Sequence, residues 1–344
     1  MNRAIALLFT IFSCAAADNV RDRSYYEAKF YDWLQKYEHL KPKNGGRFLE
    51  MLKNFANNDD IIELTNAENL PYKLGHNAFS HMSLDEFKDY YRLGLGRSNP
   101  SEGASFIHEA PTNLSAVPDS VDWSTKGAVT QVKDQGQCGS CWSFSATGAM
   151  EGAYYIKTGT LNSYSEQHLV SCDTTDAGCN GGLMDNAFAW TKSNGGICHE
   201  EDYAYTSGTS GKSGSCAPDC SKDSGVAPKS YTDVEKFSDS ALMSALAQQP
   251  VSIAIEADQS SFQLYKSGVL TAKCGSKLDH GVLAVGYGTL DGTDYYKVKN
   301  SWGASWGMDG YILLERGNED NINFRGQNAG QCGILSGPPS YPNL

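Results

Sequence analysis

The sequence predicts an α+β protein of two lobes, one mainly helical and one mainly of β-strands, preceded by a separate helical segment. The chain of 344 residues is long enough for about two domains at ~150 residues each. Of its ten cysteines, one lies in the first 17 residues and nine lie beyond residue 117. Beyond that point helical spacing gives way to strand-like alternation. A cleft between two such lobes is a favoured place for a binding site.

The first 17 residues are typical of a secretory signal peptide. Arg3 precedes the apolar run 4–12, and alanines 15–17 supply a small-residue cleavage pattern. The run is too short to span a bilayer, and no other segment reaches the ~18 apolar residues that a spanning helix needs. A buried N-terminal helix is the alternative. We expect a secretory protein whose cysteines meet an oxidising environment, destined for a lysosome or vacuole or for the outside of the cell.

Residues 18–110 are predicted to be helical. A first helix places an aromatic stripe at helical spacing, formed by Tyr26, Phe30, Trp33 and Tyr37. A second helix has apolar positions at Phe48, Leu52, Phe55, Ile62 and Leu64. Ser83 and Glu86 form a capping box at the start of a third, short helix.

A linker follows these helices. Residues 97–111 mix Gly, Ser, Pro and Glu without periodicity. The linker ends in a glycosylation sequon at Asn113, although a lone sequon does not show that a glycan is attached.

The composition and the hydrophobic pattern of the sequence change at Val117. Residues 141–157 are predicted to form a helix that Gly159 can end, with one apolar face formed by Trp142, Ala146, Ala149, Ala153 and Ile156. Residues 160–225 are rich in Gly, Ser and Cys, as in a region of loops joined by disulfides. Residues 226–344 alternate like strands, with a hairpin turn at 290–293 and with Tyr296, Val298 and Asn300 on one strand face.

The charge excludes one class of function. Lys and Arg number 28 against 40 Asp and Glu, for a formal net charge of −12. Strong nucleic-acid binding needs a basic footprint, and none is present. An acidic surface suits a protein that works in an acidic compartment, although an ordinary acidic soluble protein would have it too.

Three residues far apart in the sequence form a candidate catalytic set. Cys141 lies in the first turn of a predicted helix, where the partial positive charge of the helix N-terminus favours a thiolate. His280 follows 139 residues later and could take the thiol proton. The thiolate could then attack a peptide carbonyl, and the imidazolium could protonate the leaving amine. Asn300 could fix the orientation of the ring without adding negative charge.

Two further residues complete the expected site. The side-chain amide of Gln135, with the backbone N–H of Cys141, could hold a developing oxyanion, worth ~3 kcal/mol per donor. Trp302 could shield the His280–Asn300 hydrogen bond from water. Each of these residues alone is more often structural, and a lone cysteine is more often part of a disulfide. The presence of all these residues together is far harder to explain by coincidence than the presence of any one of them.

Seven stretches of the sequence are similar to landmarks of one family. The chain resembles, over nearly its whole length, a papain-family cysteine protease of the cathepsin L-like group. The matching stretches are Val121-Asp122-Trp123, Lys126-Gly127-Ala128-Val129-Thr130, the Gln135 to Trp142 block, Ser165-Glu166-Gln167, Gly178-Cys179-Asn180-Gly181-Gly182, Asp279-His280 and Asn300-Ser301-Trp302-Gly303.

The resemblance implies a papain-like two-lobed fold with an active-site cleft between the lobes. The helical left lobe would cover about 117–228 and the antiparallel, β-barrel-like right lobe about 229–344. Residues 18–116 would be a propeptide that blocks the cleft and is removed at acid pH, with the mature enzyme beginning near 114–117. The partners implied are protein and peptide substrates, the chain's own propeptide and cystatin-type inhibitors. The enzyme would be a monomer with no cofactor, metal, nucleic acid or membrane span.

The match in the propeptide is partial. Its helical motif is present at Phe55, Asn58, Ile62 and Asn66, but Arg47 and Met51 stand at its first two positions. In a second motif His81 replaces an aspartate. We hypothesise that His81 charges at low pH and helps to loosen the propeptide, since histidine titrates near ~6.5. A solvated histidine with no such role is the alternative.

The resemblance also implies the disulfides. Cys138 would pair with Cys179, Cys172 with Cys216 and Cys274 with Cys332. Cys198 and Cys220 have no counterpart in the family's basic three-bridge pattern, and we expect them to form a fourth bridge. Cys141 would remain the free thiol. Eight cysteines alone allow 105 pairings, so only the resemblance selects these.

The substrate site is expected to be apolar. Gly181 and Gly182 would let an extended peptide approach, with the Gly182 backbone binding it like an added strand. The positions that match the main specificity pocket are small or apolar: Leu183, Met184, Ala254, Leu278, Gly281 and Gly337. We expect an endopeptidase that prefers Leu, Phe or Val at the second residue before the cut (P2) and uses Arg there poorly.

Three other functions compete with this interpretation. Cys138 and Cys141 form a C-x-x-C, as in thiol–disulfide oxidoreductases, but that function leaves His280 and Asn300 without a role. An inactive, papain-like binding protein would usually have lost the nucleophile, whereas this chain keeps the Cys, His, Asn and Gln of the expected site. A zinc site is disfavoured because oxidised cysteines are poor ligands and no paired histidines accompany them.

Overall fold

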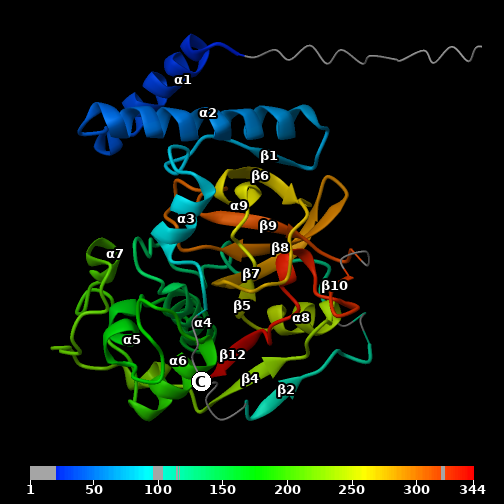
Figure 1. Cartoon of the computed structure of the whole chain (residues 1–344). Coiled ribbons are helices and arrows are strands. Elements are labelled where there is room, and N and C mark those ends of the chain that lie inside the picture. Colours follow the sequence, from blue (N-terminus) through cyan, green and yellow to red (C-terminus); the bar gives the residue numbers. More distant parts are fainter. Residues whose placement is uncertain (1–20, 96–103, 114, 116, 319–321) are drawn as a thin grey trace, which may run out of the picture.

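The computed structural model describes residues 21–95, 104–113, 115, 117–318 and 322–344. The signal peptide, part of the linker and Leu114 of the sequon lie outside the described residues. We call residues 21–113 the N-terminal segment and residues 117–344 the body. Figure 1 shows the first helices of the N-terminal segment stacked at one end of the body.

The N-terminal segment is built on two crossing helices. Its elements are α1 (Arg23–Lys36), η1 (Glu38–Leu40), α2 (Gly45–Ala67), β1 (Tyr72–Leu74), α3 (Leu84–Tyr91) and β2 (Phe106–His108). The expected aromatic stripe packs against α2, with Phe30 fully buried. The capping box at Ser83 and Glu86 is present at the start of α3. Leu64 departs from expectation, because it is 71% exposed on the outer face of α2.

Two short strands correct the prediction for this segment. β1 lies in a stretch expected to be helical, and β2 lies in the expected linker. β1 pairs antiparallel with β6, and β2 pairs parallel with β4. Each strand has three residues, and its partner is more than 120 residues away in the sequence. Therefore no local pattern in the sequence could predict either strand.

The first lobe of the body is helical, as expected. Its elements are α4 (Cys141–Thr158), α5 (Glu166–Cys172), α6 (Met184–Ser193), α7 (Ser207–Ser210) and η3 (Ser224–Val226). The predicted inner face of α4 is buried, except that Ile156 is 42% exposed. Gly159 ends α4 with a φ of 77°, which is the left-handed region that favours glycine.

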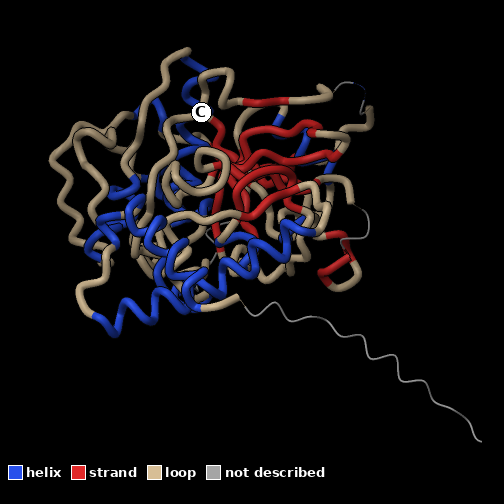
Figure 2. The backbone as a smooth tube through the Cα atoms, turned by 90° about the horizontal axis from the view of Figure 1, so that it is seen from above, coloured by secondary structure: helices blue, strands red, loops and turns tan. Residues whose placement is uncertain are grey.

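The second lobe is a twisted sheet with two short helices. Its elements are β4 (Ser230–Val234), α8 (Asp239–Leu246), β5 (Val251–Ile255), α9 (Ser260–Gln263), β6 (Tyr265–Leu270), β7 (His280–Leu290), β8 (Thr293–Lys299), β9 (Tyr311–Glu315), β10 (Ile322–Phe324), β11 (Gln327–Asn328), η4 (Gln331–Gly333) and β12 (Ser340–Asn343). The expected hairpin joins β7 to β8 through Asp291 and Gly292, both of which have positive φ. Figure 2 shows the strands gathered on one side of the molecule.

The main sheet draws on all parts of the chain. Its order is β1-β6-β9-β8-β7-β5-β12-β4-β2, and β3 (Val121–Asp122) pairs with β7. The pairs β6–β9 and β2–β4 are parallel, and the other pairs of this sheet are antiparallel. The N-terminal segment thus supplies both end strands.

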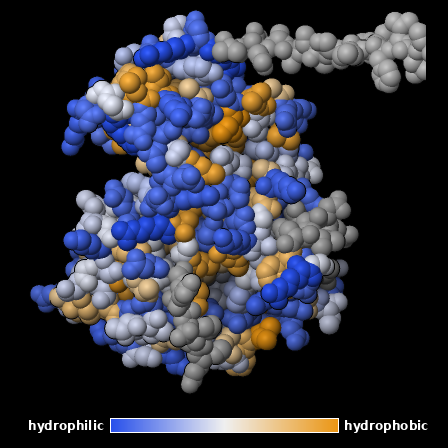
Figure 3. All heavy atoms as spheres, viewed as in Figure 1, coloured by the Kyte–Doolittle hydropathy of each residue, from blue (hydrophilic) through white to orange (hydrophobic). Residues whose placement is uncertain are grey.

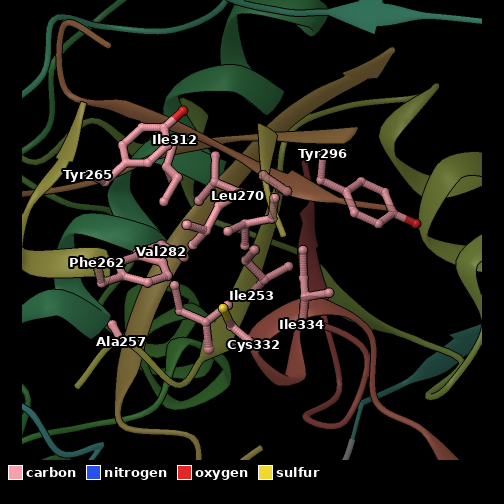
Figure 4. Packing of buried hydrophobic residues seen from close by; sticks show 14 of the residues in the cluster. Ile253, Ala257, Phe262, Tyr265, Leu270, Val282, Tyr296, Ile312, Cys332 and Ile334 are labelled. Carbon is pink, nitrogen blue, oxygen red and sulfur yellow. The ribbon is translucent and has the colours of Figure 1, made fainter. Parts of the chain in front are cut away.

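The cores lie on either side of the α4–β7 contact. One apolar cluster fills the sheet lobe, where side chains from β5 to β9 interdigitate (Figure 4). A second joins the helices of the first lobe to Leu283 and Val285 of β7. On the face shown in Figure 3, hydrophilic residues predominate and hydrophobic ones show in patches between them. The first residues of α4 and β7 lie close together at the boundary between the two cores.

Candidate active site

Cys141 and His280 are the first residues of the two elements that meet between the lobes. Cys141 begins α4, and His280 begins β7. The backbone N–H of Gly281 donates a hydrogen bond to the Cys141 Sγ over 3.4 Å. This bond holds the thiol beside the residue that follows His280. Among the described cysteines, Cys141 is the free thiol.

The His280 ring is held by Asn300. His280 Nε2 lies 2.8 Å from Asn300 Oδ1, which also accepts the backbone N–H of Ser301. An amide oxygen only accepts hydrogen bonds, so the proton of the neutral ring is on Nε2. His280 Nδ1 is buried and has no hydrogen-bond partner among the described residues, so it can take a proton. Trp302 stacks on the ring at 4.8 Å and covers the bond to Asn300.

The covered site disfavours charge, contrary to the expectation of a thiolate here. Burial raises the pKa of the Cys141 thiol to about 11, outweighing the amide groups of Gly281 and the start of α4, which lower it. Burial likewise lowers the pKa of His280 to about 4, against the hydrogen bond to Asn300. The helix N-terminus is present as predicted, but exclusion of water is the stronger effect. Burial thus opposes the thiolate–imidazolium pair in this form of the chain.

Gln135 lies beside the pair, held by the loop that carries Asn300. Its Oε1 accepts a hydrogen bond from the Ser301 hydroxyl over 2.7 Å. Its Nε2, the expected oxyanion donor, donates to the carbonyls of Cys138 and Tyr91 over 3.1 and 3.4 Å. Tyr91 belongs to the N-terminal segment, so the donor is engaged by that segment.

The N-terminal segment covers the site from α3 onward. The Tyr91 and Phe87 rings both lie 5.0 Å from Trp302, on which Tyr91 stacks. The backbone N–H of Gly94 donates to the carbonyl of Asp279 over 2.7 Å, directly before His280. A Cβ on Gly139 would lie 2.7 Å from the Cys179 carbonyl oxygen and 3.1 Å from that of Arg92, so the segment also packs tightly against this loop. These contacts depend on tertiary packing, and no local pattern in the sequence indicated them.

The expected specificity positions come together on one side of the site. Gly281 pairs with Ala254 across β7 and β5, and its Cα faces the sulfur of Met184. A Cβ on Gly337 would lie 2.8 Å from Leu278 and 3.6 Å from Ala254. Leu183 caps the start of α6, next to Met184. The grouped side chains are apolar.

The structure gives a different reason for the glycines at 181 and 182. Gly181 has a φ of 108°, which only glycine adopts readily. A Cβ on Gly182 would lie 2.5 Å from the Trp142 ring. The pair is needed for backbone geometry and for packing against α4, besides any approach of a peptide.

The cysteines are joined in the pairs that the resemblance implies. Bridges link Cys138 to Cys179, Cys172 to Cys216, Cys198 to Cys220 and Cys274 to Cys332. Because Cys138 is bonded to Cys179, it does not form a redox pair with Cys141. This removes the basis of the oxidoreductase alternative.

A buried network of charged side chains, which the sequence did not reveal, lies next to the site. Lys133 Nζ bonds both oxygens of Glu166, at 2.7 and 2.9 Å, and lies 3.5 Å from Glu151. Lys299 reaches Thr130 over 2.9 Å, and burial lowers its pKa to about 8. The network lines a cavity of about 20 Å³ that also touches Asn300 and Gly281. It joins the strand that carries Asn300 to the helical lobe.

His81 is buried at the junction of α1 and α2. It is 5% exposed, its Nδ1 donates to the carbonyl of Ala78 over 3.0 Å, and its ring packs on Trp33. Burial lowers its pKa to about 4. The solvated alternative is therefore wrong.

The described residues include neither a membrane-spanning helix nor a cluster of metal ligands. No helix there is both long enough and apolar enough to cross a membrane. No group of three or more His, Cys, Asp or Glu side chains there is arranged to hold a metal ion.

Known proteins share both parts of this architecture. Residues 117–339 match the papain family cysteine protease, and residues 30–87 match the cathepsin propeptide inhibitor domain. The chain belongs to the papain family of cysteine proteases and carries a propeptide of the cathepsin type.

Individual relatives agree with this assignment. The chain is 40% identical to the senescence-specific cysteine protease SAG39 of Oryza sativa subsp. indica, over 99% of each chain. It is 44% identical to cysteine proteinase RD21A of Arabidopsis thaliana over 93% of its own length, and spans 66% of that relative. The proform of the ragweed pollen cysteine protease Amb a 11 superposes with a TM-score of 0.80 at 35% identity, covering 94% of this chain and 96% of that one.

Proposed function

We propose that the chain is the zymogen of a cysteine endopeptidase in which Cys141 is the nucleophile and His280 the general base and acid. The observation that carries this is the His280–Asn300 bond, which leaves Nδ1 without a partner among the described residues, while the N–H of the next residue, Gly281, bonds the Cys141 thiol. Residues 1–17 would be the signal peptide, 18–116 the propeptide and 117–344 the peptidase. Cleavage would fall near 114–117.

The same geometry outlines the reaction once the cleft is open. Nδ1 of His280 takes the Cys141 proton, and Asn300 orients the resulting imidazolium through Nε2. The thiolate attacks the peptide carbonyl, and Gln135 Nε2 and the Cys141 N–H bind the oxyanion. His280 protonates the leaving amine and then activates the water that releases the acyl group. Gln135 becomes available when Tyr91 leaves.

The apolar group around Met184, Ala254 and Gly337 supports a preference for Leu, Phe or Val at P2. None of the six expected positions supplies a carboxylate for an arginine side chain. We further propose that Gly182 and Trp302 border the bound peptide, that cystatin-type proteins inhibit the enzyme, and that it acts as a monomer. An acidic vacuole or the cell exterior is the proposed location. Asn113, which is exposed, is a proposed glycosylation site.

Hydrolysis of two dipeptide reporters tests the proposal. The acid-activated chain should cleave a Phe-Arg reporter at least tenfold better than an Arg-Arg reporter, and the matched Cys141→Ala chain should cleave neither. Residual activity in the Cys141→Ala chain would reject the assignment of Cys141 as the nucleophile. Comparable use of both reporters would reject the pocket assignment while leaving the catalytic roles intact.

A further inference from the structure

The strand β2 docks on the body far from the catalytic site. It pairs in parallel with β4, with Phe106 opposite Thr232 and His108 opposite Val234. In Figure 1 this pair lies at the end of the molecule opposite to α1 and α2. The two family matches end at residue 87 and begin at residue 117, so neither covers β2.

His108 makes this docking specific. Its Nδ1 lies 3.0 Å from the hydroxyl of Tyr341 on β12, and its Nε2 lies 3.0 Å from the hydroxyl of Ser244 on α8. A hydroxyl can donate or accept, so a neutral imidazole satisfies both contacts in either tautomer. The two hydroxyls therefore form a notch that fits an imidazole.

Backbone bonds supply the rest of the attachment. The N–H of Glu235 donates to the His108 carbonyl over 3.0 Å, and the N–H of Ala110 donates to the Glu235 carboxylate over 3.1 Å. Phe106 and Ile107 are 63% and 66% exposed, so they contribute little buried apolar area. Without β2, β4 would become an edge strand with unpaired backbone groups, ready to pair with another extended chain.

We propose that the edge of β4, with Ser244 and Tyr341, is a second peptide-binding site, and that its ligand is the released segment 104–111. The segment binds as an extended strand and inserts an imidazole between the two hydroxyls, in the manner of strand addition. This rests on the proposed cleavage near 114–117, which frees the segment from the body.

The charge state of the ligand fits the notch. Among the described residues, the hydrogen-bond partners of the His108 ring are two neutral hydroxyls, and Glu235 bonds the neighbouring backbone. Burial lowers the pKa of His108, so protonation favours the unbound segment. Binding should be strongest at neutral pH and weaken as the pH falls through the range in which free histidine titrates.

Binding of a synthetic peptide tests the proposal. The probe is a fluorescent copy of residues 104–111, and its partner is the processed enzyme with Cys141 blocked by an irreversible epoxide inhibitor. At pH 7 the peptide should bind saturably, and a His108→Ala peptide should bind about tenfold or more weakly, as expected for losing two hydrogen bonds. A Tyr341→Phe enzyme should weaken binding of the native peptide but not of the His108→Ala peptide.

The uncleaved Cys141→Ala chain is the control for occupancy. Its own segment fills the site, so it should bind the added peptide at least tenfold more weakly than the processed enzyme. Absence of binding at millimolar peptide, or equal binding of the His108→Ala peptide, would overturn the proposal. So would loss of binding when the cleft is blocked. An enzyme that binds the peptide but cleaves no reporter would instead reject the proposed function alone.

Discussion

Replacement of His81 should shift the pH at which the propeptide loosens. The folded chain holds this residue with a pKa of about 4, because burial disfavours its charged form, whereas an exposed histidine titrates near 6.5. A group whose folded pKa is lowered prefers to bind its proton in the opened state. Protonation therefore favours opening, and the effect grows as the pH falls from 6.5 towards 4.

The two pKa values set the size of the effect. Titration of His81 raises the equilibrium constant for opening by about 30-fold at pH 5, which corresponds to ~2 kcal/mol. At pH 7.5 its contribution is less than ~0.1 kcal/mol. Arg47 and Glu86 are the charged groups that act on the ring, in opposite directions and less strongly than burial. His81→Asn removes the titration and can still donate to the Ala78 carbonyl.

Hydrogen exchange of residues 21–95 in the inactive Cys141→Ala background measures this opening. At pH 5.0 the chain with His81 should open about 30-fold more often than the His81→Asn chain, and at pH 7.5 the two should agree. In the active chain His81→Asn should mature more slowly at pH 5. The exposed His39→Asn is the matched control and should change neither result. Equal opening of the His81 and His81→Asn chains at both pH values would refute the reasoning, as would an unchanged maturation profile in a His81→Asp chain.

Three other substitutions probe the site and its support. Gly182→Ala places a methyl group against Trp142 and should lower the free energy of unfolding by ~1–3 kcal/mol in urea titrations, so an unchanged midpoint would contradict the packing. Lys133→Met leaves the Glu166 carboxylate buried without its cation and should cost ~3–5 kcal/mol, visible as a lower Tm at pH 7. Asn300→Ala removes the bond that orients the catalytic ring and should lower kcat by ~10–100-fold with KM little changed, whereas an effect on KM alone would assign Asn300 to substrate binding.

Local patterns in the sequence were sufficient for the helices before residue 160 and for the hairpin, but not for α5 and α6, in a stretch expected to be loops, or for α8 and α9, in a stretch expected to alternate like strands. The start of α4 at Cys141, the capping box at Ser83 and the turn at Asp291 each depend on residues within a few positions of one another. The pairing of the cysteines does not, and only the family resemblance selected it.

Properties created by tertiary contact could not be predicted in this way. β1 and β2 are strands only because β6 and β4 provide hydrogen bonds. The helix N-terminus was expected to favour the Cys141 thiolate, but burial, which depends on the packing of both lobes, raises the pKa of the thiol. Lys133 and Glu166 attracted no functional prediction, because they are 33 residues apart and pair only once the helical lobe has folded.

The covered site opposes the reaction in two ways. Burial raises the pKa of Cys141 and lowers that of His280, which disfavours the charged pair. The carbonyl of Tyr91 engages Gln135, so the oxyanion donor is occupied as well. Trp302 stacks on His280 and on Tyr91, and its contact with His280 does not require the segment. Loss of the contact with Tyr91 would therefore free one donor bond of Gln135, whereas the His280–Asn300 bond lies within the body and does not depend on that contact.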